Sequence, residues 1–232
     1  PALPETRVEI NTPITESPAA FALSPDGRLL VFVASGDGAS RLWLRSLATT
    51  TAQPLAGTDG ATLPFWSPDS RSIGFFAGGQ LKRFDLAAGA PQTLATIING
   101  AGGAWTADGR IVFGSTNGGL RRVTAAGGVS EAATKLNMGE RNHRSPFVLP
   151  DGRRFLYYVQ GTPDVAGIYL GALDGRAPTR LAPADTGTAA YVPLGPGSTD
   201  ASLGGGWMLW VRAGTQTLVA QRLDVERAAL TG

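Results

Sequence analysis

The chain has no cysteine and only one histidine among its 232 residues. The absence of cysteine excludes disulfide bonds, thiol catalysis and cysteine-ligated metal sites. Only 16% of the residues are charged, with 20 basic against 18 acidic side chains and no run of five like charges. This balance does not indicate binding to nucleic acid. No stretch of eighteen apolar residues occurs, so this segment is not expected to insert into a membrane.

A short turn motif recurs four times along the chain. Its aspartates are 43, 39 and 43 residues apart (69−26, 108−69, 151−108) and are Asp26, Asp69, Asp108 and Asp151. A short segment rich in β-branched and aromatic residues follows each turn, at 29–33, 73–76, 111–113 and 155–159. A period near forty residues that contains only strands and turns is typical of a β-propeller blade.

The turn motif itself has a structural explanation. In Ser24-Pro25-Asp26-Gly27-Arg28, proline presets φ, the aspartate can bond its own backbone, and glycine tolerates positive φ. Because every repeat carries the aspartate at the same place, a propeller would spread these carboxylates around the ring. We therefore interpret them as turn residues rather than as a catalytic or calcium-binding cluster.

The repeats predict an all-β fold, a β-propeller with five recognisable four-stranded blades in a single domain over 1–232. The predicted blades are 19–58, 62–96, 101–134, 144–183 and 188–226. The fifth is degraded, with a long glycine-rich loop at 195–206 in place of the usual turn. Segment 5–12 is expected to be a ring-closing outer strand. We expect the blades to belong to a six-bladed ring, completed either by residues beyond Gly232 or by self-association through open blade edges.

Trp66 and Trp105 stand at equivalent positions, three residues before their turn aspartates. We expect both indoles to be buried between adjacent blades, since aromatic residues dominate cores of this kind.

The turn motif and the strands beside it resemble those of TolB-type, WD-repeat-like bacterial β-propellers. More narrowly, segments 21–28, 64–76 and 167–174 are similar to the extracytoplasmic C-terminal propeller of bacterial eukaryotic-like serine/threonine protein kinases. The resemblance covers residues 5 to 232. It implies a periplasmic or extracellular sensor or protein-binding module of a signalling protein, not an enzyme, with no catalytic residues to carry over.

His143, the single histidine, lies just before the innermost strand of the fourth predicted blade, flanked by Arg141 and Arg144. Its place in the repeat predicts a position near one mouth of the central channel, where these three side chains could bind a ligand. No G-x-S-x-G motif accompanies it, and one histidine without cysteine is a poor zinc site. We favour a histidine that bonds a neighbouring backbone group or the aspartate of a turn over a catalytic one, and predict no cofactor and no metal site.

Arg83 and Arg122 are 39 residues apart, which is one blade, and could form a small basic stripe that meets an acidic partner. A solvated face is the alternative. We expect a non-enzymatic recognition module whose loops bind a protein, peptide or glycan, because stiff scaffolds carry function on their loops. The alternative is a propeller domain of, or accessory to, a hydrolase such as a peptidase.

Overall fold

The computed structural model describes residues 10, 12–15, 19–36, 38–184, 187, 189–194, 205–215 and 217–231. Within these residues the chain forms twenty β-strands and no helix. The prediction of an all-β fold is confirmed.

The strands form five antiparallel sheets, each made of four strands that follow one another in the chain. The first two sheets contain β1 (Phe21–Leu23), β2 (Leu29–Ala34), β3 (Arg41–Ser46), β4 (Ala52–Pro54), β5 (Thr62–Trp66), β6 (Ser72–Ala77), β7 (Gln80–Asp85) and β8 (Pro91–Thr96). The next two contain β9 (Gly100–Trp105), β10 (Arg110–Ser115), β11 (Arg121–Thr124), β12 (Glu131–Ala132), β13 (Glu140–Val148), β14 (Arg154–Gly161), β15 (Gly167–Ala172) and β16 (Thr179–Ala182). The last contains β17 (Ala189–Pro193), β18 (Gly206–Val211), β19 (Leu218–Asp224) and β20 (Ala229–Thr231). Each sheet is a propeller blade, which confirms the prediction of five four-stranded blades.

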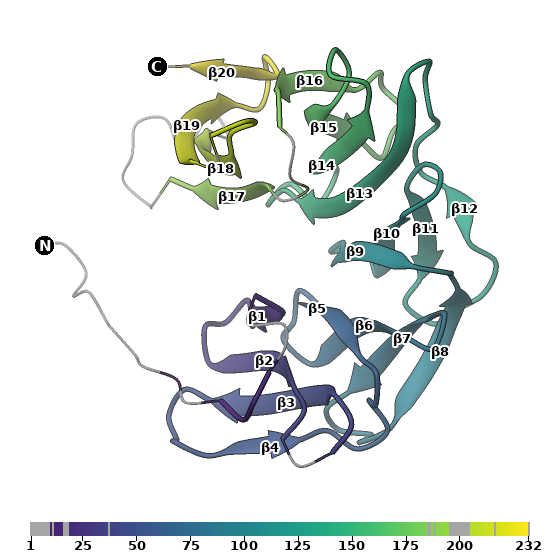
Figure 1. Ribbon diagram of the computed structural model, residues 1–232, viewed down its shortest axis with the longest axis vertical. Helices are drawn as coiled ribbons and strands as arrows, with labels where there is room; N and C mark the ends of the chain where they lie inside the picture. The colour runs from purple at the N-terminus through teal and green to yellow at the C-terminus, as the bar shows by residue number, and fades with distance from the viewer. Residues whose placement is uncertain are drawn as a thin grey trace, which may run out of the picture.

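Figure 1 shows the blades along an open arc, with the first and fifth blades at its two ends. The first strand of each blade lies on the inner side of the arc and the fourth strand on the outer side. At one end of the arc, β1 carries two exposed apolar side chains, Phe21 (58% exposed) and Leu23 (52% exposed). The expected ring-closing strand at 5–12, apart from Ile10 and Thr12, and residues 195–204 of the expected loop lie outside the described residues.

The core lies in the joints between neighbouring blades. Because side chains alternate across a strand, each blade presents one apolar row to the blade before it and another to the blade after it. In the joint between the first and second blades, Val31 and Leu42 pack with Ile73 and Phe75. The other joints are built in the same way, by Phe76 with Phe113, Val112 with Tyr157, and Leu156 with Met208.

The predicted turns are present, and hydrogen bonds explain their aspartates. Asp26 Oδ1 accepts the hydroxyl of Ser24 at 2.6 Å and the backbone N–H of Arg28 at 3.1 Å. Asp69 Oδ1 accepts equivalent bonds from Ser67 at 2.6 Å and from the backbone of Arg71 at 3.1 Å. Asp108 and Asp151 accept hydrogen bonds from their own turns in the third and fourth blades, so each of the first four blades holds one such aspartate as a turn residue.

Two blades extend beyond their predicted ends. β20 supplies a fourth strand to the fifth blade at Ala229–Thr231, past the predicted end at 226. β13 begins at Glu140 rather than near 144 and pairs with β14 over nine residues that include two irregularities. Its polar first half reads as a turn in the sequence, but pairing with β14 satisfies its backbone groups.

Candidate ligand-binding pocket between the second and third blades

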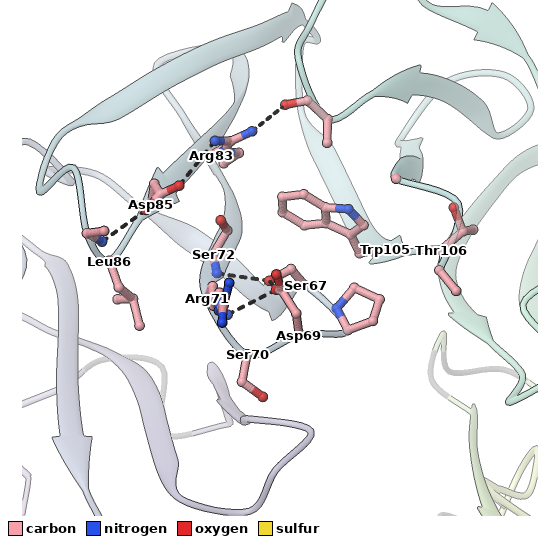
Figure 2. A pocket seen from close by; sticks show the side chains of 15 residues that line it. Ser67, Asp69, Ser70, Arg71, Ser72, Arg83, Asp85, Leu86, Trp105 and Thr106 are labelled. Atoms are coloured by element: carbon pink, nitrogen blue, oxygen red, sulfur yellow. Dashed lines mark hydrogen bonds and ion pairs between the residues drawn. The ribbon is translucent and has the colours of Figure 1, made fainter.

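A pocket of about 760 Å³ opens in the joint between the second and third blades, and we call it the joint pocket. The turns of the two blades form its ends, at Ser67–Ser72 and Thr106–Gly109. Figure 2 shows the Trp105 indole on one side and Arg83, Asp85 and Ser72 on the other. The volume lies in the range of small-molecule sites.

An ion pair on β7 forms one wall of the joint pocket. Arg83 Nη2 donates to Asp85 Oδ2 at 3.2 Å, and Arg83 Nη1 donates across the joint to the carbonyl of Ala125 at 3.0 Å. Asp85 Oδ1 accepts the backbone N–H of Ala87 at 2.9 Å. Arg83 Nε is buried and has no hydrogen-bond partner among the described residues.

Trp105 forms the opposite wall and differs from its counterpart one blade earlier. Trp66 is 7% exposed and its Nε1 donates to the carbonyl of Ala22 in the first blade at 2.9 Å. Trp105 is half-buried, and its ring meets Phe65 edge-on with centroids 6.5 Å apart. No hydrogen bond from its Nε1 is found among the described residues. The prediction of burial is confirmed for Trp66, whereas for Trp105 it is only half correct.

The sequence of the second blade explains why this joint is hollow. The strand registers make Ser72 the counterpart of Leu29 in the first blade, and Arg83 the counterpart of Leu44. Both leucines pack against the core of the joint between the first and second blades. In the next joint a small hydroxyl side chain and an ion-paired arginine stand in their place. The space that the two leucines fill is therefore left open beside Trp105.

The joint pocket is lined by equal numbers of acidic and basic side chains. Asp69 and Asp85 oppose Arg71 and Arg83. The hydrogen bond from Ser67, the backbone of Arg71 and the nearby Arg71 charge outweigh desolvation and hold the pKa of Asp69 below its usual value. Asp69 is therefore negatively charged at neutral pH. The Arg71 side chain is exposed and has no hydrogen-bond partner among the described residues.

His143 is buried in the joint between the third and fourth blades, with 1% of its surface exposed. Its Nδ1 lies 2.7 Å from Thr134 Oγ1 and its Nε2 lies 3.0 Å from Glu140 Oε2. Desolvation holds the pKa of His143 below its usual value, although Glu140 opposes this, so the ring is neutral at pH 7. A neutral ring that accepts from Thr134 and donates to Glu140 uses both nitrogens. This is the hydrogen-bonded histidine that the sequence favours, with side chains as its partners rather than a turn aspartate.

The four arginines of the predicted site do not form one patch. Arg141 is exposed, whereas the Arg144 guanidinium lies over the Tyr158 ring at 4.9 Å. Arg122 binds Glu131 Oε2 through Nη2 at 3.3 Å on its own blade. Of the predicted site residues, only Arg83 lines the joint pocket.

The described part of the chain contains no candidate metal site and no helix that could cross a membrane. No three His, Cys, Asp or Glu side chains come together in a way that could hold a metal ion. No helix long and apolar enough to cross a membrane is found there.

No protein-family model and no curated protein sequence matches the chain, but solved structures do. TolB from Acinetobacter baumannii superposes with a TM-score of 0.71 at 15% identity, over 89% of this chain and 51% of TolB. The chain has the TolB-type β-propeller fold. Oligogalacturonate lyase from Vibrio parahaemolyticus gives a TM-score of 0.64 at 17% identity, over 90% of this chain and 63% of the lyase. Hydrazine synthase from Kuenenia stuttgartiensis gives a TM-score of 0.61 at 10% identity, over 95% of this chain and 70% of the synthase chain.

This TolB-type propeller therefore spans about half the length of TolB and under two thirds of the lyase. At these identities the likeness concerns the fold alone. The shared fold carries both a protein named TolB and enzymes, so any function of this chain lies in its own side chains.

Proposed function

We propose that this TolB-type propeller is a non-enzymatic recognition module that binds its ligand in the joint pocket. The observation that carries the proposal is the contrast between two equivalent joints. The joint with Leu29 and Leu44 is filled, and the joint with Ser72 and Arg83 holds about 760 Å³. A half-buried indole and the Arg83–Asp85 ion pair line this space. Such an arrangement provides an apolar surface with a few oriented polar groups, as binding pockets do.

His143 and the turn aspartates, the side chains that the sequence offers for acid–base chemistry, are already hydrogen-bonded within the domain. His143 uses both ring nitrogens in a buried joint, and the turn aspartates accept hydrogen bonds from their own turns. General acid–base catalysis needs a titratable group within reach of a substrate proton. These contacts support recognition without turnover.

We place this module outside the cytoplasm of a bacterium, as part of a signalling protein. The support is the resemblance of segments such as 64–76 to the propellers that follow the kinase domain in bacterial serine/threonine kinases. The gene sequence around this segment tests this. A kinase domain and one membrane span upstream would agree with a sensor, and a downstream α/β-hydrolase would instead favour the peptidase alternative.

The ligand-binding part of the proposal is tested by thermal shift with three pools of compounds: neutral oligosaccharides, acidic oligosaccharides and peptides. Each pool is tested on the parent protein and on Ser72→Leu/Arg83→Leu. This variant gives the second blade the leucines that the first blade has at the equivalent positions, so that they fill the joint pocket. Arg122→Leu is the matched control, because it makes the same change one blade along. We expect at least one pool to raise the melting temperature of the parent and of the control, but not of the filled variant. If no pool does so, or if mass spectrometry shows that the bound compound has been cleaved, the proposal is wrong.

A further inference from the structure

Within the proposed recognition role, on which this step rests, the chemistry of the joint pocket selects a class of ligand. Two carboxylates and two guanidinium groups line it, Asp69, Asp85, Arg71 and Arg83, so its formal charge is zero. A carboxylated ligand would have to approach both aspartates, and a cationic ligand both arginines. Because unlike charges attract and like charges repel most strongly where water is excluded, neither gains a net attraction here. The charge pattern favours a neutral ligand.

The hydrogen-bonding groups of the joint pocket include both donors and acceptors. The exposed Arg71 guanidinium and Trp105 Nε1 are donors that make no hydrogen bond to the described residues. Asp85 Oδ1 and Oδ2 each accept one bond, although a carboxylate oxygen can accept two. A hydroxyl group donates one bond and accepts others. A ligand that carries several hydroxyls can therefore satisfy both kinds of group at once, whereas a carboxylate can satisfy only the donors.

The Trp105 indole adds a flat apolar wall on the side facing Ser72. Its ring is held by Phe65 of the second blade, with ring planes at 63° to each other. A sugar ring is apolar on the face that carries its axial C–H bonds and polar around its rim, so it can lie on an indole while its hydroxyls reach the surrounding groups. From these three features we infer that the joint pocket binds a neutral saccharide.

Two pockets lie between the fourth and fifth blades: a small one of about 140 Å³ lined by Tyr191, and a second that serves as an internal comparison. The second is smaller than the joint pocket, about 540 Å³, and no tryptophan, tyrosine or phenylalanine lines it. Its central arginine, Arg154, already donates to Asp151, to the carbonyl of Val225 and to Glu226. It therefore lacks the aromatic wall that distinguishes the joint pocket.

Titration calorimetry and saturation-transfer NMR test the inference with cellobiose, maltose and N,N′-diacetylchitobiose as neutral probes, digalacturonate as an acidic probe and an acidic peptide. We expect at least one neutral disaccharide to bind the parent protein more tightly than either acidic probe. Trp105→Ala should weaken that binding about tenfold, the equivalent of about 1.4 kcal/mol. Trp207→Ala, at an exposed tryptophan of the fifth blade, should leave it unchanged.

A second variant keeps the test meaningful if Trp105→Ala fails to fold. Asp85→Asn removes one negative charge without changing the shape of the side chain. It should weaken the neutral disaccharide and improve the binding of digalacturonate, because the joint pocket then carries a net positive charge.

The outcomes separate this inference from the broader proposal. In one outcome, no neutral disaccharide binds up to about 10 mM, whereas digalacturonate or the peptide binds the parent protein and not Ser72→Leu/Arg83→Leu. This outcome overturns the saccharide inference and leaves the recognition role in place. Disaccharide binding that survives in the filled variant overturns the inference as well. If every probe and every pool either fails to bind or binds the filled variant as well as the parent, both the saccharide inference and the recognition proposal are wrong.

Discussion

Replacing Trp66 by alanine should destabilise the domain far more than the same change at Trp105. Trp66 is 7% exposed, packs in the core of the joint between the first and second blades, and donates from Nε1 to the carbonyl of Ala22 at 2.9 Å. Loss of this burial together with the cavity left behind should cost about 3–5 kcal/mol in free energy of unfolding. Trp105 already exposes part of its ring to the joint pocket. Its removal creates less new cavity, and we expect a cost of about 1–2 kcal/mol.

A third variant separates packing from hydrogen bonding. Trp66→Phe keeps most of the aromatic volume but leaves the Ala22 carbonyl without its donor. It should cost more than the hydrogen bond alone, which is worth about 1 kcal/mol, and less than Trp66→Ala. A single domain is stable by about 5–15 kcal/mol, so the change at Trp66 removes a large fraction of the total.

Urea unfolding followed by circular dichroism measures these costs, provided that the slope with urea is the same for all variants. Trp207→Ala is the matched control for loss of an exposed indole. Equal costs for Trp66→Ala and Trp105→Ala would contradict the contrast between a filled and a hollow joint. That result would also remove the main support for a binding site beside Trp105.

Acidification should destabilise the domain in two stages. Burial holds the pKa of His143 below 6.5 in the folded protein, so the unfolded chain binds this proton at a higher pH than the folded one does. The free energy of unfolding should therefore fall as the pH drops below about 6.5. In a series of melting curves at different pH values, His143→Gln should remove this stage. Hydrogen bonds hold the pKa of Glu140 below 4.5 despite its burial, so further stability is lost below about pH 4.5, a stage that Glu140→Gln should remove. Gly74→Ala should lower the free energy of unfolding in urea by about 1–3 kcal/mol, because the added methyl group would overlap the Phe65 ring. A variant as stable as the parent would mean that the packing around Phe65 can relax. Arg154→Ala should cost about 1–2 kcal/mol, since it removes the hydrogen bonds between the fourth and fifth blades, and limited proteolysis should then cut the fifth blade sooner than in the parent.

The fold could be predicted from the sequence because its signal is local and repeated. Residues such as Asp26 and Gly27 set each turn within a few positions, and the strand that follows is recognisable by composition. β20 was missed because Ala229–Thr231 carries no turn motif of its own and depends on pairing with β19. Pairing between strands is a tertiary effect that overrides local preference.

The joint pocket was not predictable in the same way. The pocket exists because Ser72 and Arg83 occupy the positions that Leu29 and Leu44 hold one blade earlier. These positions can be matched only once the strand register is known. The sequence identified Arg83 through its spacing to Arg122, but could not show that Glu131 pairs with the second arginine. His143 was expected near the channel mouth, and the side chains that enclose it, Thr134 and Glu140, were not recognised as its partners.

The strand order within the blades has a consequence for how the chain folds. Every sheet joins strands that are consecutive in the sequence, so each can form without waiting for a distant segment. Contacts between blades reach only one repeat further, as in the Trp66–Ala22 bond between residues 44 positions apart. Repeat folds of this kind can nucleate at one repeat and propagate from it to the next. During synthesis a complete blade can emerge about every forty residues and dock on the one before it, so that each new joint is sealed before the next blade is made.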